Sequence, residues 1–113
     1  MLYTKKQTDL VLESLKKWVY IVDGTGIDEG TKNCALCREY YVNINWIEPC
    51  TECPIFEITG MDNCRGTPYW EWVEAAAEKE AYGSINIIRA AKAELKFLED
   101  LYNKTILFRK FEV

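Results

Sequence analysis

The stretch NCALCREYYVNINWIEPCTECPIFEITGMDNCRGTPYW, residues 33–70, holds all five cysteines of the chain. They form two Cys-x-x-Cys pairs twelve residues apart and a single cysteine eleven residues further on: Cys34 and Cys37, Cys50 and Cys53, and Cys64. A Cys-x-x-Cys turn directs two sulfur atoms at one centre, so two such turns complete a tetrahedron around a metal ion. The spacing therefore predicts a zinc-knuckle insert, treble- or ribbon-like, over residues 33–66.

Structural zinc, one ion per chain, is the metal that this pattern favours, with Cys34, Cys37, Cys50 and Cys53 as ligands. Thiolates are soft ligands that also suit iron–sulfur centres, so such a cluster and a metal-free group of thiols are the alternatives. The segment that precedes Cys64 is long enough to return to the site. Cys64 is therefore an alternative ligand, in place of Cys50 or Cys34.

The composition indicates one soluble domain over residues 1–113. Hydrophobic residues make up 49% of the chain, which is ample for a core. The first ten residues, MLYTKKQTDL, lack the pattern of a signal peptide, and no apolar run approaches the ~20 residues that span a bilayer. We therefore expect a cytoplasmic protein, in which paired cysteines bind metal more often than they form disulfides.

Apolar residues at helical spacing predict a helix over residues 4–22 and two more between residues 67 and 102. The first stripe consists of Val11, Leu15, Trp18 and Val22, with Val19 on the same face. Thr67 and Pro68 are typical of a helix start, and Ser84 is able to cap the next helix after a break at Gly83. That last helix carries the stripe Ile88, Ala91, Leu95, Leu98 and Tyr102.

The predicted fold is therefore an α-rich small domain, with an N-terminal helix packed on two C-terminal helices and the metal region at one end. Residues 105–112 are rich in β-formers and predict a short strand. Its best partner for a two-stranded ribbon is the alternating segment YVNINW, residues 41–46.

Several short motifs resemble a set of small, mostly uncharacterised cysteine-rich proteins encoded by bacteriophages and prophages. The motifs are CALCREYY, CTECPI, the glycine and cysteine of Gly60 and Cys64, TPYWEW and AAKAELKFLEDL, and the resemblance covers roughly residues 5–102. The resemblance implies a phage context in a bacterial host and a metal-knuckle architecture, and it implies no reaction. It also favours a role for Cys64, which matches a recurring element of the pattern.

The chain has no histidine, which removes the commonest general base and the commonest mixed zinc ligand sets. A site of four thiolates is closed, so we expect a binding protein and no enzyme. The expected partner is a host or phage protein, and a counter-defence inhibitor is one form that such a factor takes. Aromatic side chains near the metal loops are the predicted contact surface: Tyr40, Tyr41, Trp46 and Tyr69.

Two other function classes fit the sequence less well. Zinc knuckles and exposed aromatic residues also occur in nucleic-acid-binding proteins, but the net charge of −4 opposes binding to phosphates. A Cys-x-x-Cys oxidoreductase usually places its first thiol at a helix N-terminus in a βαβ context, whereas this chain is mainly helical by pattern.

Overall fold

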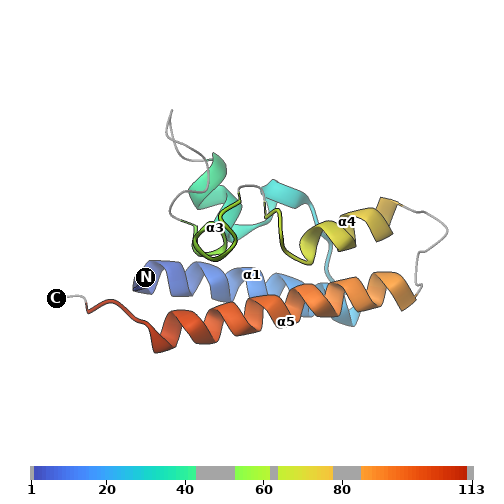
Figure 1. Ribbon diagram of the computed structural model, residues 1–113. Coiled ribbons are helices and arrows are strands. Elements are labelled where there is room, and N and C mark those ends of the chain that lie inside the picture. Colours follow the sequence, from blue (N-terminus) through green and yellow to red (C-terminus); the bar gives the residue numbers. More distant parts are fainter. Residues whose placement is uncertain (1, 43–52, 62–63, 78–84, 112–113) are drawn as a thin grey trace.

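A computed structural model of the chain describes residues 2–42, 53–61, 64–77 and 85–111, and it has two layers (Figure 1). The two long helices, α1 (Lys5–Asp23) and α5 (Ile85–Leu107), pack side by side and antiparallel. The second layer lies on one side of this pair. It consists of the 3₁₀ turn η1 (Gly30–Lys32), α2 (Ala35–Cys37), the π-helical turn η2 (Arg38–Val42), α3 (Pro54–Thr59) and α4 (Tyr69–Ala77).

Local hydrogen bonds fix both ends of α1. The Thr4 hydroxyl accepts a hydrogen bond from the Gln7 amide at 3.1 Å, and the Gln7 side chain accepts one from the Thr4 amide at 2.8 Å. This capping box satisfies amides that have no partner inside the helix. At the other end, Gly24 adopts a left-handed φ of 91°, which glycine tolerates without a steric cost. The helix therefore begins and ends within one residue of the bounds 4–22 that the sequence predicts.

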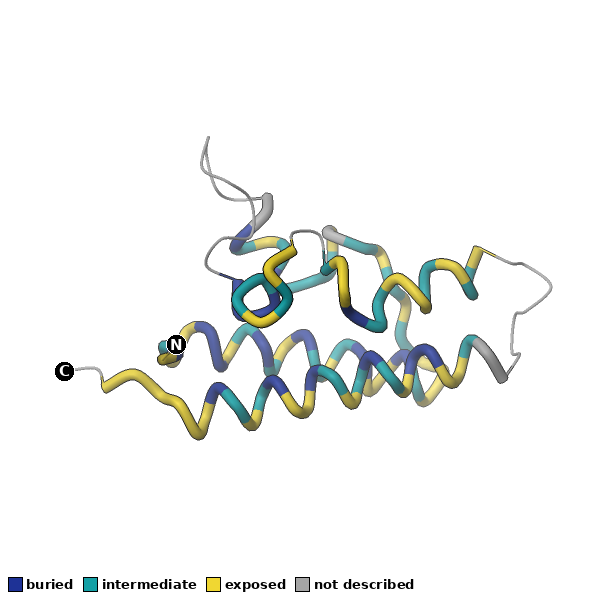
Figure 2. Tube along the Cα trace, in the orientation of Figure 1, coloured by how far each residue is buried: buried dark blue, intermediate teal, exposed yellow. Residues whose placement is uncertain are grey.

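The predicted apolar stripes form the core between α1 and α5, with two exceptions. Val11 and Trp18 are buried on α1, Ala91 and Leu98 are buried on α5, and Figure 2 shows the buried positions along the facing sides of both helices. Four further stripe residues are partly buried against this core: Leu15, Val22, Leu95 and Tyr102.

Val19 and Ile88 are exposed, so their assignment to the core is wrong. Val19 lies at the flank of the α1 stripe, beyond the width that α5 covers. Ile88 lies within the first turns of α5, at one end of the helix pair. A stripe predicted from periodicity therefore identifies the buried face, while its edges depend on the packing partner.

The predicted ribbon does not form in the part of the chain that the structure describes. Helix α5 continues to Leu107, and Tyr41 and Val42 belong to the π-helical turn η2, while residues 43–46 lie outside the described ranges. Burial of Thr105 against the rest of the molecule outweighs the β-propensity of this segment. The chain after α5 instead makes an isolated parallel bridge between Arg109 and Tyr3.

Thr67 and Pro68 precede α4 as the sequence predicts. The Thr67 hydroxyl accepts a hydrogen bond from the Tyr69 amide at 3.3 Å, and the Pro68 carbonyl accepts the first helical bond, from the Trp72 amide, at 3.2 Å. Helix α4 is described as far as Ala77, so its predicted end near Tyr82 and the break at Gly83 and Ser84 lie outside the described residues. None of the described helices is long and apolar enough to cross a membrane.

Replacing the buried Leu98 by alanine tests the packing of α1 on α5. Leu98 is 1% exposed, and its truncation leaves a cavity, so Leu98→Ala is expected to lower the free energy of unfolding by about 2–5 kcal/mol. Leu107, on the same helix, is 77% exposed, and Leu107→Ala is expected to change it by about 0.5 kcal/mol or less. Urea denaturation measures the free energy of unfolding of the parent protein and of both variants. Equal losses in the two variants would contradict the helix pairing described here.

Candidate functional site

The first cysteine pair is held by a single tight turn. Cys34 caps the short helix α2, and its sulfur accepts a hydrogen bond from the Cys37 amide at 3.4 Å. Leu36, between them, is buried in the core and anchors the turn. The Cys-x-x-Cys geometry expected from the sequence is therefore present at this pair.

The other two described cysteines come from separate segments. Cys53 is buried directly before α3, which begins with Pro54. Cys64 has a left-handed φ of 58°, a backbone conformation that side chains other than glycine adopt at an energetic cost. The Thr67 hydroxyl donates a 2.6 Å hydrogen bond to the Cys64 carbonyl and so holds this turn in place.

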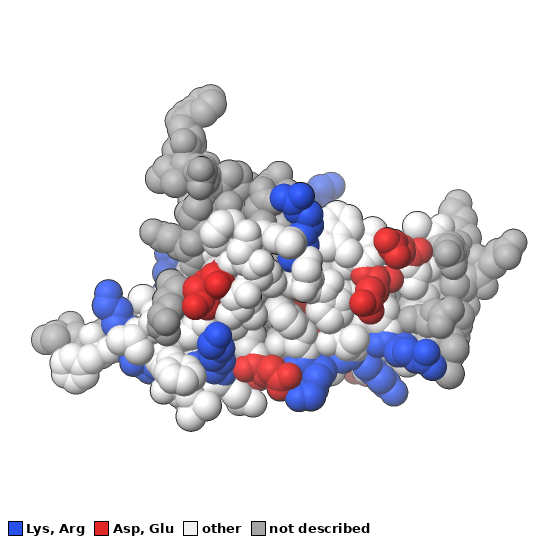
Figure 3. Space-filling view, in the orientation of Figure 1, with Lys and Arg blue, Asp and Glu red and all other residues white. Residues whose placement is uncertain are grey.

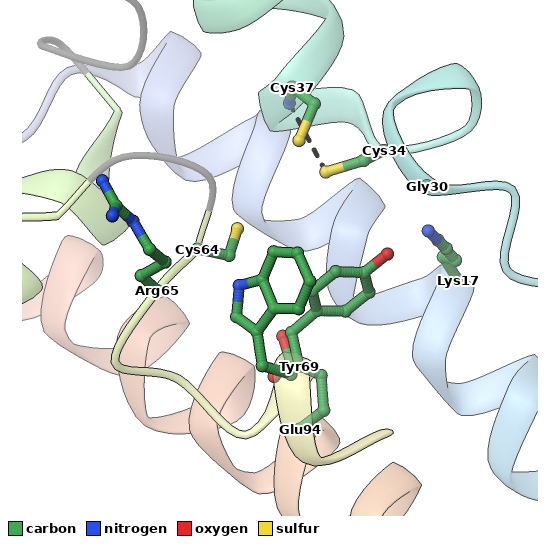
Figure 4. A pocket seen from close by; sticks show the side chains of 9 residues that line it. Lys17, Gly30, Cys34, Cys37, Cys64, Arg65, Tyr69 and Glu94 are labelled. Carbon is green, nitrogen blue, oxygen red and sulfur yellow. Dashed lines mark hydrogen bonds between the residues drawn. The ribbon is translucent and has the colours of Figure 1, made fainter. Parts of the chain in front are cut away.

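The four described cysteines line two cavities that share Cys37 and Cys64. Cys34, Cys37 and Cys64 line one cavity, and their sulfur atoms turn toward a common space in Figure 4. A small second cavity is lined by Cys37 and Cys64 together with Cys53. In the described part of the chain, no three or more histidine, cysteine or acidic side chains have an arrangement that would hold a metal ion as they stand. The fifth cysteine, Cys50, lies outside the described residues.

The thiols influence one another's protonation. The hydrogen bond between the side chains of Cys34 and Cys37, together with burial, raises the pKa of Cys34 far above its usual range. At Cys37 the bond with Cys34 acts to lower the pKa, but the bond with Cys64, burial and the nearby charges raise it to about 12. Without a bound cation Cys34 and Cys37 are therefore neutral at physiological pH.

The larger cavity, of about 500 Å³, extends from the thiols between the two layers (Figure 4). Its other lining residues are Lys17, Gly30, Arg65, Tyr69, Trp70 and Glu94. Glu94, on α5, is 3% exposed, and its Oε2 atom has no hydrogen-bond partner in the described part of the chain. Burial raises the pKa of Glu94 to about 7.

Asp28 connects the segments that surround the cavity. Its carboxylate accepts hydrogen bonds from Lys17 at 2.7 Å, the Gly30 amide at 2.9 Å, Tyr69 at 3.1 Å and Trp72 at 3.2 Å. The side chains of Lys17 and Asp28 are only 10% and 11% exposed. Burial acts to raise the pKa of Asp28, but the bonds from Lys17 and Gly30 outweigh burial and hold that pKa below its usual value.

An aromatic cluster supports the same junction. The Trp18 ring of α1 makes edge-to-face contacts with two rings of α4, those of Tyr69 at 6.0 Å and Trp72 at 5.4 Å between centroids. The Lys17 ammonium lies 5.6 Å from the centre of the Trp18 ring. These contacts pack α4 onto α1 and fix the Tyr69 ring at the wall of the cavity.

The predicted contact surface is only partly where the sequence placed it. Tyr40 is buried in the core, so its expected exposure is wrong, because η2 turns this side chain inward against the helices. Tyr69 is partly buried, and its hydroxyl is bonded to Asp28. The Tyr41 side chain and the whole of Trp46 lie outside the described parts of the structure. Trp70, which the sequence analysis did not select, is 41% exposed beside the cavity.

Three charged residues of the site were missed in the sequence analysis: Lys17, Asp28 and Glu94. Asp28 lies in the glycine-rich segment DGTGIDEG, which by composition reads as an exposed loop. Lys17 precedes Trp18 and has no periodicity that marks it as internal. Glu94 did carry a signal, because it lies three residues after Ala91 and four before Leu98, within the apolar stripe of α5. A glutamate within such a stripe indicates a buried carboxyl group.

Comparison of the chain with protein families, with curated proteins and with solved structures finds no match. The class of protein is therefore defined by its own features. It is a small α-rich domain in which helix α1 packs on α5 and α4, with a group of thiols beside a cavity at the junction of its two layers.

Replacing Asp28 by asparagine tests the junction. Asp28→Asn leaves the buried Lys17 ammonium without its counter-charge and is expected to lower the free energy of unfolding by about 3 kcal/mol at pH 7. Because the folded-state pKa of Asp28 is depressed, the stability that its charge contributes is present above the usual pKa of aspartate. The difference between parent and variant should therefore shrink as the pH falls below about 4.

The exposed pair of Lys5 and Asp9 on α1 provides a matched control. Asp9→Asn is expected to cost about 0.5 kcal/mol or less, because water screens such pairs. Denaturation curves at several pH values give the loss of unfolding free energy in each variant. A similar, pH-independent loss for the two variants would contradict the role assigned to Asp28.

Proposed function

We propose that this protein is a small zinc-stabilised binding protein that acts on a protein partner, of the kind that bacteriophages encode. The observation that carries the proposal is that Cys34, Cys37, Cys53 and Cys64 line two cavities that have Cys37 and Cys64 in common. These residues come from three segments that are separate in the sequence. Thiols gathered in this way are the ligands that structural zinc prefers.

The proposed ligand set is Cys34, Cys37, Cys53 and Cys64, which is the alternative that the spacing left open. Cys64 takes the place that the sequence analysis gave to Cys50, because Cys64 shares both cavities with Cys37. The segments around the thiols have short helices of three to six residues, α2 and α3, which are too short to be stable alone. Metal-binding free energy would therefore serve as folding free energy for this layer.

A redox role is less well supported than a structural one. Reactive cysteines have lowered pKa values and sit in electropositive surroundings. Here burial and neighbouring thiols raise the pKa values of Cys34 and Cys37. Binding without turnover is accordingly the function that we propose.

Nucleic-acid binding, the alternative class, receives little support from the charge distribution. The chain has 18 acidic and 14 basic residues. On the face drawn in Figure 3, lysine and arginine side chains alternate with aspartate and glutamate. Binding to a phosphate backbone needs a continuous basic surface.

A protein partner fits the surface beside the cavity. Trp70 is exposed there, and tryptophan is enriched among the residues that contribute most to protein interfaces. Four zinc-bound thiolates would add a net charge of about −2 to a chain of charge −4, which favours a partner with a basic surface. In the phage setting that the motifs imply, such a partner is a host or phage protein in the bacterial cytoplasm, and blocking a host defence is one effect of binding it.

Metal content and two cysteine variants test the zinc site. The purified protein is expected to contain about one zinc ion per chain, and Cys64→Ser is expected to lose most of it. Cys50→Ser is the matched control and is expected to retain the metal. Inductively coupled plasma mass spectrometry gives the zinc content, and limited proteolysis of Cys64→Ser should cut first between residues 30 and 66.

The opposite pattern is equally informative. Loss of zinc from Cys50→Ser with retention in Cys64→Ser would restore the set of two Cys-x-x-Cys pairs. A parent protein that stays folded without metal after long chelation, with five reactive thiols, would remove the zinc site. Iron and sulfide in place of zinc would identify an iron–sulfur cluster.

A capture experiment tests the binding surface. Trp70→Ala and Trp46→Ala are each expected to lose a partner that the parent protein retains from infected host cells, with zinc content unchanged, because truncating a central aromatic contact costs about 2 kcal/mol or more. Phe111→Ala is the control, because Phe111 is 86% exposed on the chain after α5 and does not line the cavity. Equal capture by all three variants would contradict the proposed surface.

A further inference from the structure

The cavity beside the thiols contains a buried carboxyl group, one oxygen of which has no hydrogen-bond partner in the described part of the chain. Glu94 lines the cavity, its side chain is almost fully covered, and its Oε2 atom lacks a partner in the described part of the chain. A buried polar atom without a partner costs about 1–3 kcal/mol, and more when it is charged. Native proteins rarely leave such an atom unpaired unless water, an ion or a ligand completes it.

The charged neighbours of Glu94 do not complete it. The Lys17 ammonium is 2.7 Å from Asp28, and that pair is buried and close to neutral as a unit. Arg65, which follows Cys64 in the sequence, also lines the cavity and has interactions of its own. Lys17 and Arg65 therefore leave the Oε2 atom of Glu94 without a partner, and a hydrogen-bond donor from outside the chain would complete it.

The walls suit the stem of a cationic side chain. The Tyr69 and Trp70 rings meet edge to face, with 5.7 Å between their centroids, on one side of the cavity. Aromatic faces attract ammonium and guanidinium groups, and they also pack against the methylene groups that carry them. A volume of about 500 Å³ is ample for one such side chain.

We propose that this cavity receives a lysine or arginine side chain of the protein partner, whose ammonium or guanidinium group binds the Glu94 carboxylate while its stem packs against Tyr69 and Trp70. This inference rests on the proposed function and specifies the chemistry of the partner. It explains why a carboxylate occupies a core position of α5, where an apolar residue would stabilise the isolated protein more.

Blocked amino acids serve as probes in place of the unidentified partner. Nα-acetyl-arginine amide, its uncharged counterpart Nα-acetyl-citrulline amide, and the free diamine putrescine are titrated separately into the zinc-loaded protein, with backbone amide NMR shifts as the readout. The arginine probe is expected to bind in the millimolar range and to shift amides around Tyr69 and Glu94. The citrulline probe is expected to bind at least about tenfold more weakly, because it lacks the charge-assisted hydrogen bond.

Glu94→Gln removes the charge and keeps the shape, and Glu99→Gln, at an exposed position of the same helix, is its matched control. Glu94→Gln is expected to bind the arginine probe at least about tenfold more weakly, with zinc content unchanged and a melting temperature no lower than that of the parent protein. Glu99→Gln is expected to bind the arginine probe like the parent.

Three results would overturn the inference: equal binding of arginine and citrulline probes, unchanged binding by Glu94→Gln, or loss of zinc from Glu94→Gln, which would make Glu94 part of the metal site. Tighter binding of putrescine than of the arginine probe would assign the cavity to a free polyamine and overturn the assignment to a partner. Binding of the arginine probe by a parent protein that holds no zinc would contradict the zinc site while the cavity assignment stands.

Discussion

The structure depends on one carboxylate, that of Asp28, which lies between the two layers. It accepts hydrogen bonds from Lys17 on α1, from the Gly30 amide of η1, and from Tyr69 and Trp72 on α4. Because η1 leads into the turn of the first cysteine pair and α4 follows the turn of Cys64, this group sets the distance between segments that carry the thiols. A charge in this position is tolerated because its counter-charge and its hydrogen-bond donors are all supplied by the fold.

The helices were predictable because their signals are local. A repeat of apolar residues every three or four positions identifies α1 and α5, and Thr67 with Pro68 marks the approach to α4. The predictions that were wrong concern features that depend on contacts between distant segments. The end of α5 was misread as a strand because Thr105 is buried by packing that the local sequence does not reveal. Tyr40 was expected at the surface because the sequence pattern does not predict η2, the turn that places this side chain in the core.

The candidate site divides in the same way. The turn of Cys34 and Cys37 follows from its spacing, whereas the proximity of Cys64 follows from a left-handed turn and a return of the chain that spacing only permits. Glu94 is the clearest example of a site residue that the sequence predicts only in part. Its place within an apolar stripe shows that it is buried, but the cavity and the neighbouring charges come from three other segments. Contacts between charged residues that are far apart in the sequence cannot be predicted from local sequence patterns.

The pairing of the first long helix with the last has a consequence for the time course of synthesis. Helix α1 leaves the ribosome first, and its partner α5 follows only after residues 24–84 have been made. At ~5–20 residues per second this interval lasts several seconds, during which the face of α1 that packs on α5 is not yet covered by that helix. Closing so long a loop also slows the encounter of the two helices. A truncated product that lacks α5 would keep this apolar face of α1 exposed, and we expect it to be prone to aggregate.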